Sequence, residues 1–71
     1  MNMDDYSNYE PCSDLPGWLI STSPLSLGVG VAIWNGKTGK AARRHAVATR
    51  QSNPDAAKGA ALPILREWVG P

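Results

Sequence analysis

Few residue types in this 71-residue chain could carry out chemistry, and the first candidate group is the triplet Gly36-Lys37-Thr38. Gly-Lys-Thr ends the phosphate loop of many nucleotide-binding enzymes, where backbone N–H groups and a lysine hold phosphates. That loop also needs a glycine five residues before Gly36, but position 31 is Val31. Gly30 is six residues before Gly36, which is one residue too far. The spacing therefore predicts a turn of ordinary turn residues rather than a phosphate site.

The other reactive candidates are Cys12 and His45, each the only residue of its type. Nucleophilic catalysis would need a thiol or hydroxyl beside a base that a third group orients. Cys12 lies in an acidic segment, and neighbouring carboxylates disfavour a reactive thiolate. One Cys and one His also cannot supply the three or four ligands that zinc takes, and Asp4 with Asp5 is a weak oxygen pair. We expect no catalytic residue, metal, other cofactor or small-molecule substrate.

The distribution of charge is more informative than these residues. Residues 37–50 contain five of the seven Lys and Arg residues and no acid, although the whole chain has a net charge of only +1. A basic β-hairpin can lie in a nucleic-acid groove or follow phosphates, and it can equally dock on an acidic protein surface. The alternative is an edge strand that its charges protect from aggregation. The predicted binding residues are Lys37, Lys40, Arg43, Arg44, His45 and Arg50.

The N-terminal segment has the opposite character. Residues 1–16 contain four acids and no Lys or Arg, with Pro11 and Pro16 as breakers and no apolar periodicity. We predict an acidic, mostly irregular arm of net charge −4, followed by a single small domain over residues 17–71. Tyr6, Tyr9 and Leu15 could attach part of the arm to that domain. A tethered acidic arm could also cover the basic segment until a partner displaces it.

Composition limits the class of protein. A single cysteine cannot close an intrachain disulfide, which favours a reducing compartment such as the cytoplasm. The start Met1-Asn2-Met3-Asp4-Asp5 lacks the positive charge of a secretory signal. Residues 18–34 are the most apolar stretch, but serines and a proline interrupt it, so no membrane-spanning helix is expected.

About three strands are predicted over residues 17–50. Residues 17–22 suit a short strand that ends at Ser23-Pro24. Residues 25–34 alternate strictly, with Leu, Val and Ile at odd positions and small residues at most even ones, which is typical of a strand. Asn35-Gly36 favours a type I′ hairpin turn, with a longer loop through Gly39 as the second option. The turn makes residues 41–50 the returning strand, with Arg43 and His45 on one face and Arg44 and Arg50 on the other.

A helix is predicted from Asn53 to Trp68. Asn53-Pro54-Asp55 supplies a capping side chain, a proline at the first helical position and an acid at the positive end of the helix dipole. Pro63 should kink or split this helix, because it lacks an N–H group for the carbonyl of Gly59. The predicted fold is therefore α+β: an acidic arm, an antiparallel sheet of about three strands and this helix. We expect the helix to pack on the small-residue face of strand 25–34, which leaves the Leu/Val/Ile face needing a second layer or a partner.

Residues 53–68 resemble the Ala-rich closing helix of double-stranded-RNA-binding domains, but the Gly-x-Gly and paired-Lys features of that family are missing before the helix. None of its binding residues can be transferred. The expected function is a non-enzymatic binding module whose basic hairpin contacts nucleic acid or an acidic protein surface. The alternatives are a small interaction or inhibitor protein, such as a phage or mobile-element accessory, that acts through its apolar strand and tryptophans, or a structural homodimer.

Overall fold

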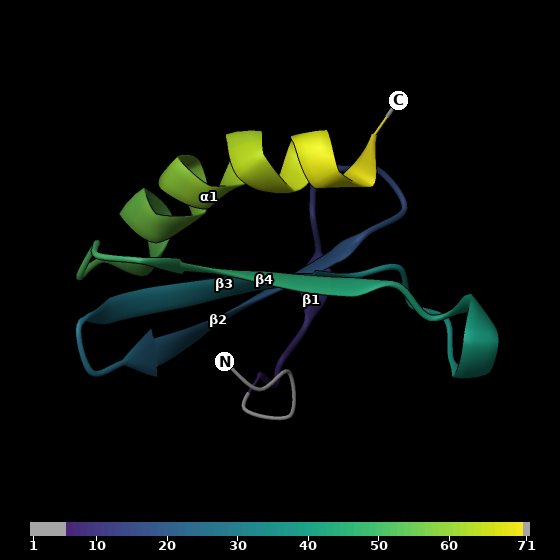
Figure 1. Cartoon of the computed structure of the whole chain (residues 1–71), viewed down its shortest axis with the longest axis horizontal. Coiled ribbons are helices and arrows are strands. Elements are labelled where there is room, and N and C mark those ends of the chain that lie inside the picture. Colours follow the sequence, from purple (N-terminus) through teal and green to yellow (C-terminus); the bar gives the residue numbers. More distant parts are fainter. Residues whose placement is uncertain (1–5, 71) are drawn as a thin grey trace.

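The computed structural model describes residues 6–70, which form one antiparallel sheet with a single helix across one face (Figure 1). This is the predicted α+β class. The strands are β1 (Glu10–Pro11), β2 (Leu19–Leu25), β3 (Gly28–Trp34) and β4 (Arg44–Thr49), in the order β1-β2-β3-β4. A 3₁₀ turn, η2 (Gly39–Ala41), precedes β4, and α1 (Pro54–Val69) ends the fold. The additional strand, β1, is only two residues long, which is too short for a periodic signal.

The turn between β2 and β3 lies at Ser26 and Leu27, so the prediction that the first strand ends at Ser23-Pro24 was wrong. Pro24 is instead part of β2, opposite Val29. Proline is tolerated there because β1 pairs only with the start of β2, which leaves this half of β2 at the edge of the sheet. The alternating segment 25–34 is thus divided between the end of β2, the turn and β3.

The helix packs on the bulky face of β3, contrary to the prediction that it would cover the small-residue face. Val31 and Ile33 lie fully buried against Ala57, Ala61 and Leu65 of α1. Two alanines on the helix leave room for branched side chains on the strand, so large residues pack against small ones across this layer. The Leu/Val/Ile face of β3 therefore needs no partner.

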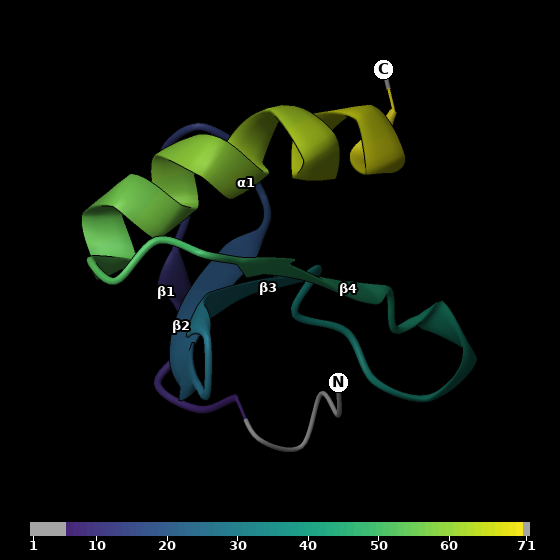
Figure 2. The ribbon, with the colours of Figure 1, turned by 60° about the vertical axis from the view of Figure 1, so that its left-hand side comes forward.

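The N-terminal segment covers the opposite, small-residue face of the sheet. An ideal Cβ on Gly30 would collide with the hydroxyl group of Tyr6, whose side chain is buried. Ser21 Oγ donates a hydrogen bond to the carbonyl of Ser7. After β1 the chain passes to the α1 side, where Leu15 joins the core (Figures 1 and 2). The part of the arm that the structure describes is therefore attached to both faces of the sheet.

The helix begins as its sequence predicts. Asn53 Oδ1 accepts hydrogen bonds from the backbone N–H groups of Asp55 and Ala56 at 2.8 and 3.4 Å. α1 then runs through Pro63 as one continuous helix and does not split there. Pro63 and Gly59 are both exposed, so water can reach the carbonyl that lacks its N–H partner.

Candidate functional site

Five of the six predicted binding residues gather at one end of the sheet. Lys37 and Lys40 are exposed in the loop 35–43, Arg43 is the last residue of that loop, and Arg44 and His45 begin β4. The loop projects beyond the sheet at the end where α1 terminates (Figures 1 and 2). We call this surface the basic end, and it comprises these five residues together with the rings of Tyr9, Trp18, Trp34 and Trp68.

The loop is the longer of the two predicted options, and the two-residue type I′ turn was wrong. Asn35 explains the choice, because its side chain binds backbone groups across the loop. Its Oδ1 accepts from the N–H groups of Lys37 and Arg43, both at 3.1 Å, and its Nδ2 donates to the carbonyl of Ala41 at 2.8 Å. The Asn35 N–H also donates to the carbonyl of Arg43 at 3.1 Å. One amide side chain thus holds the loop that carries the two lysines.

On the face of the sheet opposite α1, Arg44 lies over the indole ring of Trp34. The Arg44 Cζ atom is 4.8 Å from the ring centroid, and the two residues are paired in the β3–β4 register. Tyr9 makes an edge contact with the same indole, at 5.7 Å between centroids and 67° between planes. The Nε1–H group of Trp34 donates to the carbonyl of Lys37 at 2.7 Å. Contacts from β4, from the N-terminal arm and from the loop 35–43 therefore hold the Trp34 ring in place.

On the α1 face, Arg43 and His45 lie on the same side, as predicted, and both contact tryptophans. Arg43 Cζ is 4.7 Å from the centroid of Trp68 and 5.6 Å from that of Trp18. The His45 ring stacks on Trp68 at 4.7 Å and 9°. Trp18 and Trp68 meet edge to face at 5.8 Å and also pack against the core. Arg43 itself lies just before the observed strand, because β4 spans Arg44–Thr49 rather than residues 41–50.

No carboxylate of the described residues neutralises the arginines of the segment 37–50. Within residues 6–70, none of Arg43, Arg44 and Arg50 forms an ion pair. Glu10 of the arm is instead 3.5 Å from Lys58 of α1. Asp4 and Asp5, which the predicted covering arm would also use, lie outside the described residues. The described acids therefore leave the positive charge of the basic end available.

The hydroxyl group of Tyr9 is buried at this surface without a hydrogen-bond partner among the described residues. Burial raises the pKa of Tyr9 above its usual value of 10.0, because the phenolate loses its hydration, and the positive charge of Arg44 opposes part of that rise. Tyr9 therefore contributes its ring to the contact with Trp34 while its hydroxyl group is unsatisfied.

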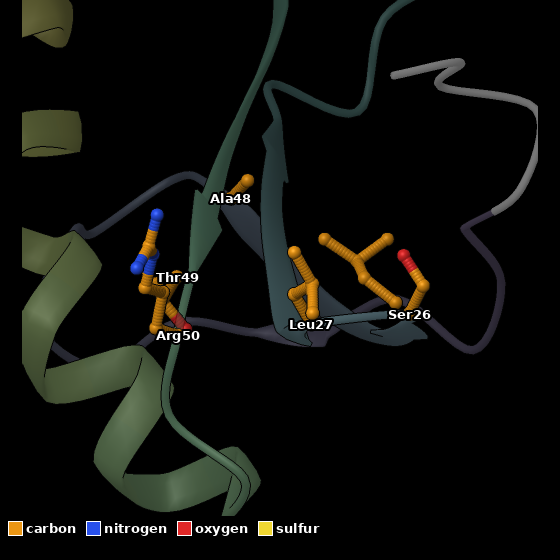
Figure 3. Close-up of a pocket in the computed structure, with 6 residues that line it drawn as sticks. Ser26, Leu27, Ala48, Thr49 and Arg50 are labelled. Carbon is orange, nitrogen blue, oxygen red and sulfur yellow. The ribbon is translucent and has the colours of Figure 1, made fainter.

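Arg50, the sixth predicted residue, lies away from the other five because it follows the far end of β4. It lines an open hollow of about 260 Å³ (Figure 3) together with residues of the β2–β3 turn and the end of β4. Leu27 in that turn is 77% exposed. The other lining residues are Leu25, Ser26, Ala48 and Thr49. Arg50 is thus the one predicted binding residue that the fold does not bring to the basic end.

The residues that were considered for nucleophilic or metal chemistry are not brought together in the described chain. Cys12 is buried in the core cluster, and His45 is stacked on Trp68. Residues 6–70 contain no group of three or more His, Cys, Asp and Glu side chains placed to hold a metal ion. In the same range, no helix combines the length and apolar character needed to cross a membrane.

The contacts between the tryptophans and the arginines were not predicted from the sequence. All three tryptophans are half-buried at the basic end, and each lies beside an arginine. The observed register places Trp34 opposite Arg44, whereas the predicted two-residue turn would have placed it opposite Lys37. Comparison with protein-family models, with curated proteins and with solved structures returns no match to this chain.

Proposed function

We propose that this protein is a non-enzymatic binding module whose basic end engages a polyanion, with nucleic acid as the partner that the geometry favours. The observation that carries the proposal is that Arg43 and Arg44 lie on indole rings and form no ion pair with a described carboxylate. A cation–π contact holds a guanidinium group through its flat face. The N–H groups at its edge then remain available to bind an anion in a bidentate way.

Preorganisation supports binding at this site. A free arginine side chain loses considerable rotamer freedom when it binds, and a stacked one has already lost part of it. Lys37 and Lys40 add positive charge on the loop that projects beyond the sheet. Phosphates of nucleic acid repeat regularly along a chain, so several of these cations could each meet one.

The alternative of strand addition has less support from the topology. The apolar strand β3 lies between β2 and β4, and β4 is the strand at the free edge. A partner, or a second copy, that paired with β3 would first have to displace one of its neighbours. The exposed alternating face that motivated this alternative is covered by α1.

Fluorescence anisotropy with a labelled random-sequence oligonucleotide tests the proposal, at low and at moderate salt. We expect binding that weakens steeply as salt rises, because counterions are released from the phosphates. Arg44→Gln should weaken binding several-fold, whereas Arg50→Gln, which removes the same charge at the far end of β4, should have little effect. Equal losses in both variants would show that net charge alone drives binding and would contradict the proposed site.

An acidic peptide such as polyglutamate serves as the competing partner in the same assay. Preferential binding of the peptide over the oligonucleotide would contradict nucleic acid as the partner while leaving the basic end as a polyanion site. Binding of neither would refute the proposed function as a whole.

A further inference from the structure

We infer, on the basis of the proposed function, that the partner is a single strand of nucleic acid, with one base stacked on the outer face of Arg44 and the backbone crossing the loop toward Arg43. This inference names the form of the ligand and gives the two arginines different tasks. It depends on the aromatic rings that each arginine contacts on its own face of the sheet.

The stack on the face opposite α1 is suited to an unpaired base. The Arg44 guanidinium group lies over Trp34, with its Cζ atom 4.8 Å from the ring centroid, and Arg44 is exposed. Trp34 is held in place by its Nε1–H bond to the Lys37 carbonyl and by the ring of Tyr9. Unpaired bases in bound single strands stack on aromatic rings and on guanidinium planes. A base on Arg44 would lie on the opposite side of the guanidinium group from Trp34.

The stack on the α1 face is suited to a phosphate. Arg43 lies over Trp68 and near Trp18, and its backbone N–H group is bound by the side chain of Asn35. His45 stacks on Trp68 beside it. Arg43 is exposed although it lies against two tryptophans, so its N–H groups remain accessible to an anion. The edge that these groups form matches the geometry of a phosphate.

The two arginines are adjacent in sequence but lie on opposite faces of the sheet. A ligand that reaches both must therefore bend around the end or the free edge of β4, near the loop that carries Lys37 and Lys40. A single strand is flexible and exposes its bases, whereas a duplex hides the faces of its bases and bends only at considerable cost. This placement, together with the positive charge along the path, favours a single strand.

The test compares four labelled probes by anisotropy under the same salt conditions: a mixed-sequence single-stranded DNA, its duplex, a strand of the same length without bases, and inorganic polyphosphate. We expect the single strand with bases to bind at least about fivefold more tightly than each other probe, which corresponds to the lower range of one base–aromatic stack. Quenching of tryptophan fluorescence should accompany its binding.

The decisive variant is Arg44→Lys, which keeps the charge and removes the planar group. It should lose the advantage of bases over the strand without bases, while its affinity for polyphosphate stays unchanged. Arg50→Lys is the matched control and should behave as the wild type with every probe. Circular dichroism of each variant confirms that it is folded before binding is compared.

The outcomes separate the two proposals. If the duplex or polyphosphate binds as tightly as the single strand, or if Arg44→Lys keeps the preference for bases, the inference is overturned and the proposed polyanion site stands. If no probe binds to the folded wild-type protein, both are overturned.

Discussion

Tyr6 fills the space above Gly30, on the face of the sheet opposite the helix. An ideal Cβ on Gly30 would lie 3.1 Å from Cζ of Tyr6 and would collide with its hydroxyl group. Glycine is therefore needed at position 30, because the side chain of Tyr6 occupies the space that a Cβ atom would fill. This contact attaches the N-terminal segment to the central strand β3.

Gly30→Ala should displace Tyr6 and lower the free energy of unfolding by about 1–3 kcal/mol, the usual cost of overpacking. Urea denaturation measures this loss. Gly59→Ala is the matched control, because no atom lies within 4 Å of a Cβ at that exposed helical position. It should raise stability by about 0.5–1 kcal/mol through helix propensity. A Gly30→Ala variant as stable as the wild type would contradict the close contact.

Removal of the helix cap should destabilise the protein moderately. Asn53→Ala deletes the oxygen that accepts from Asp55 and Ala56, and we expect a loss of about 1 kcal/mol in thermal or urea unfolding. Asn53→Asp keeps an acceptor at the same place and adds a charge that the helix dipole favours, so it should retain wild-type stability. Similar losses in both variants would argue against capping as the cause.

The loop 35–43 should depend on the side chain of Asn35. Asn35→Ala removes acceptors for the N–H groups of Lys37 and Arg43, so the amide hydrogens of these two residues should exchange faster with solvent. Amide exchange measured by NMR checks this, with the buried β3 residue Val31 as the internal reference. Asn35→Asp keeps the acceptor and should protect both amides better than Asn35→Ala. Unchanged exchange in the alanine variant would exclude this role of Asn35.

Alkaline pH should destabilise the protein through Tyr9. Its folded-state pKa is raised above 10.0, so the folded protein holds the phenol proton more tightly than the unfolded chain does. The stabilisation that comes from this bound proton is fully present below pH 10, and it is lost as the pH rises above that value. Tyr9→Phe should reduce this loss between pH 10 and 11 in urea unfolding. At pH 7 it should be neutral or slightly stabilising, because an unsatisfied hydroxyl group is removed.

The core beneath α1 should be sensitive to truncation on one face of the helix only. Leu65 is fully buried against the sheet, and Leu65→Ala should cost about 2–5 kcal/mol, a large part of the stability of so small a domain. The adjacent Ile64 is 53% exposed, and Ile64→Ala should change the free energy of unfolding by less than about 1 kcal/mol. Comparable losses at the two positions would mean that the helix packs with a different face.

Local signals predicted the helix and the strands because each signal acts over a few neighbouring residues. Asn53 and Pro54 set the start of α1 through bonds within its first turn, and the alternation around Val31 requires only a pleated strand. The concentration of basic residues in the segment 37–50 is likewise a property of the chain. The sequence was therefore sufficient for the α+β class and for five of the residues at the basic end.

The arrangement of these elements depended on contacts between segments that are far apart in the chain. Which face of β3 meets α1 was decided by volume, since Ala57 and Ala61 fit beneath branched side chains while Tyr6 fits above Gly30. The contact of Arg43 with Trp68 follows from the same packing. No local pattern encodes such complementarity, because it exists only once distant surfaces are brought together, and so only the tertiary structure decided it.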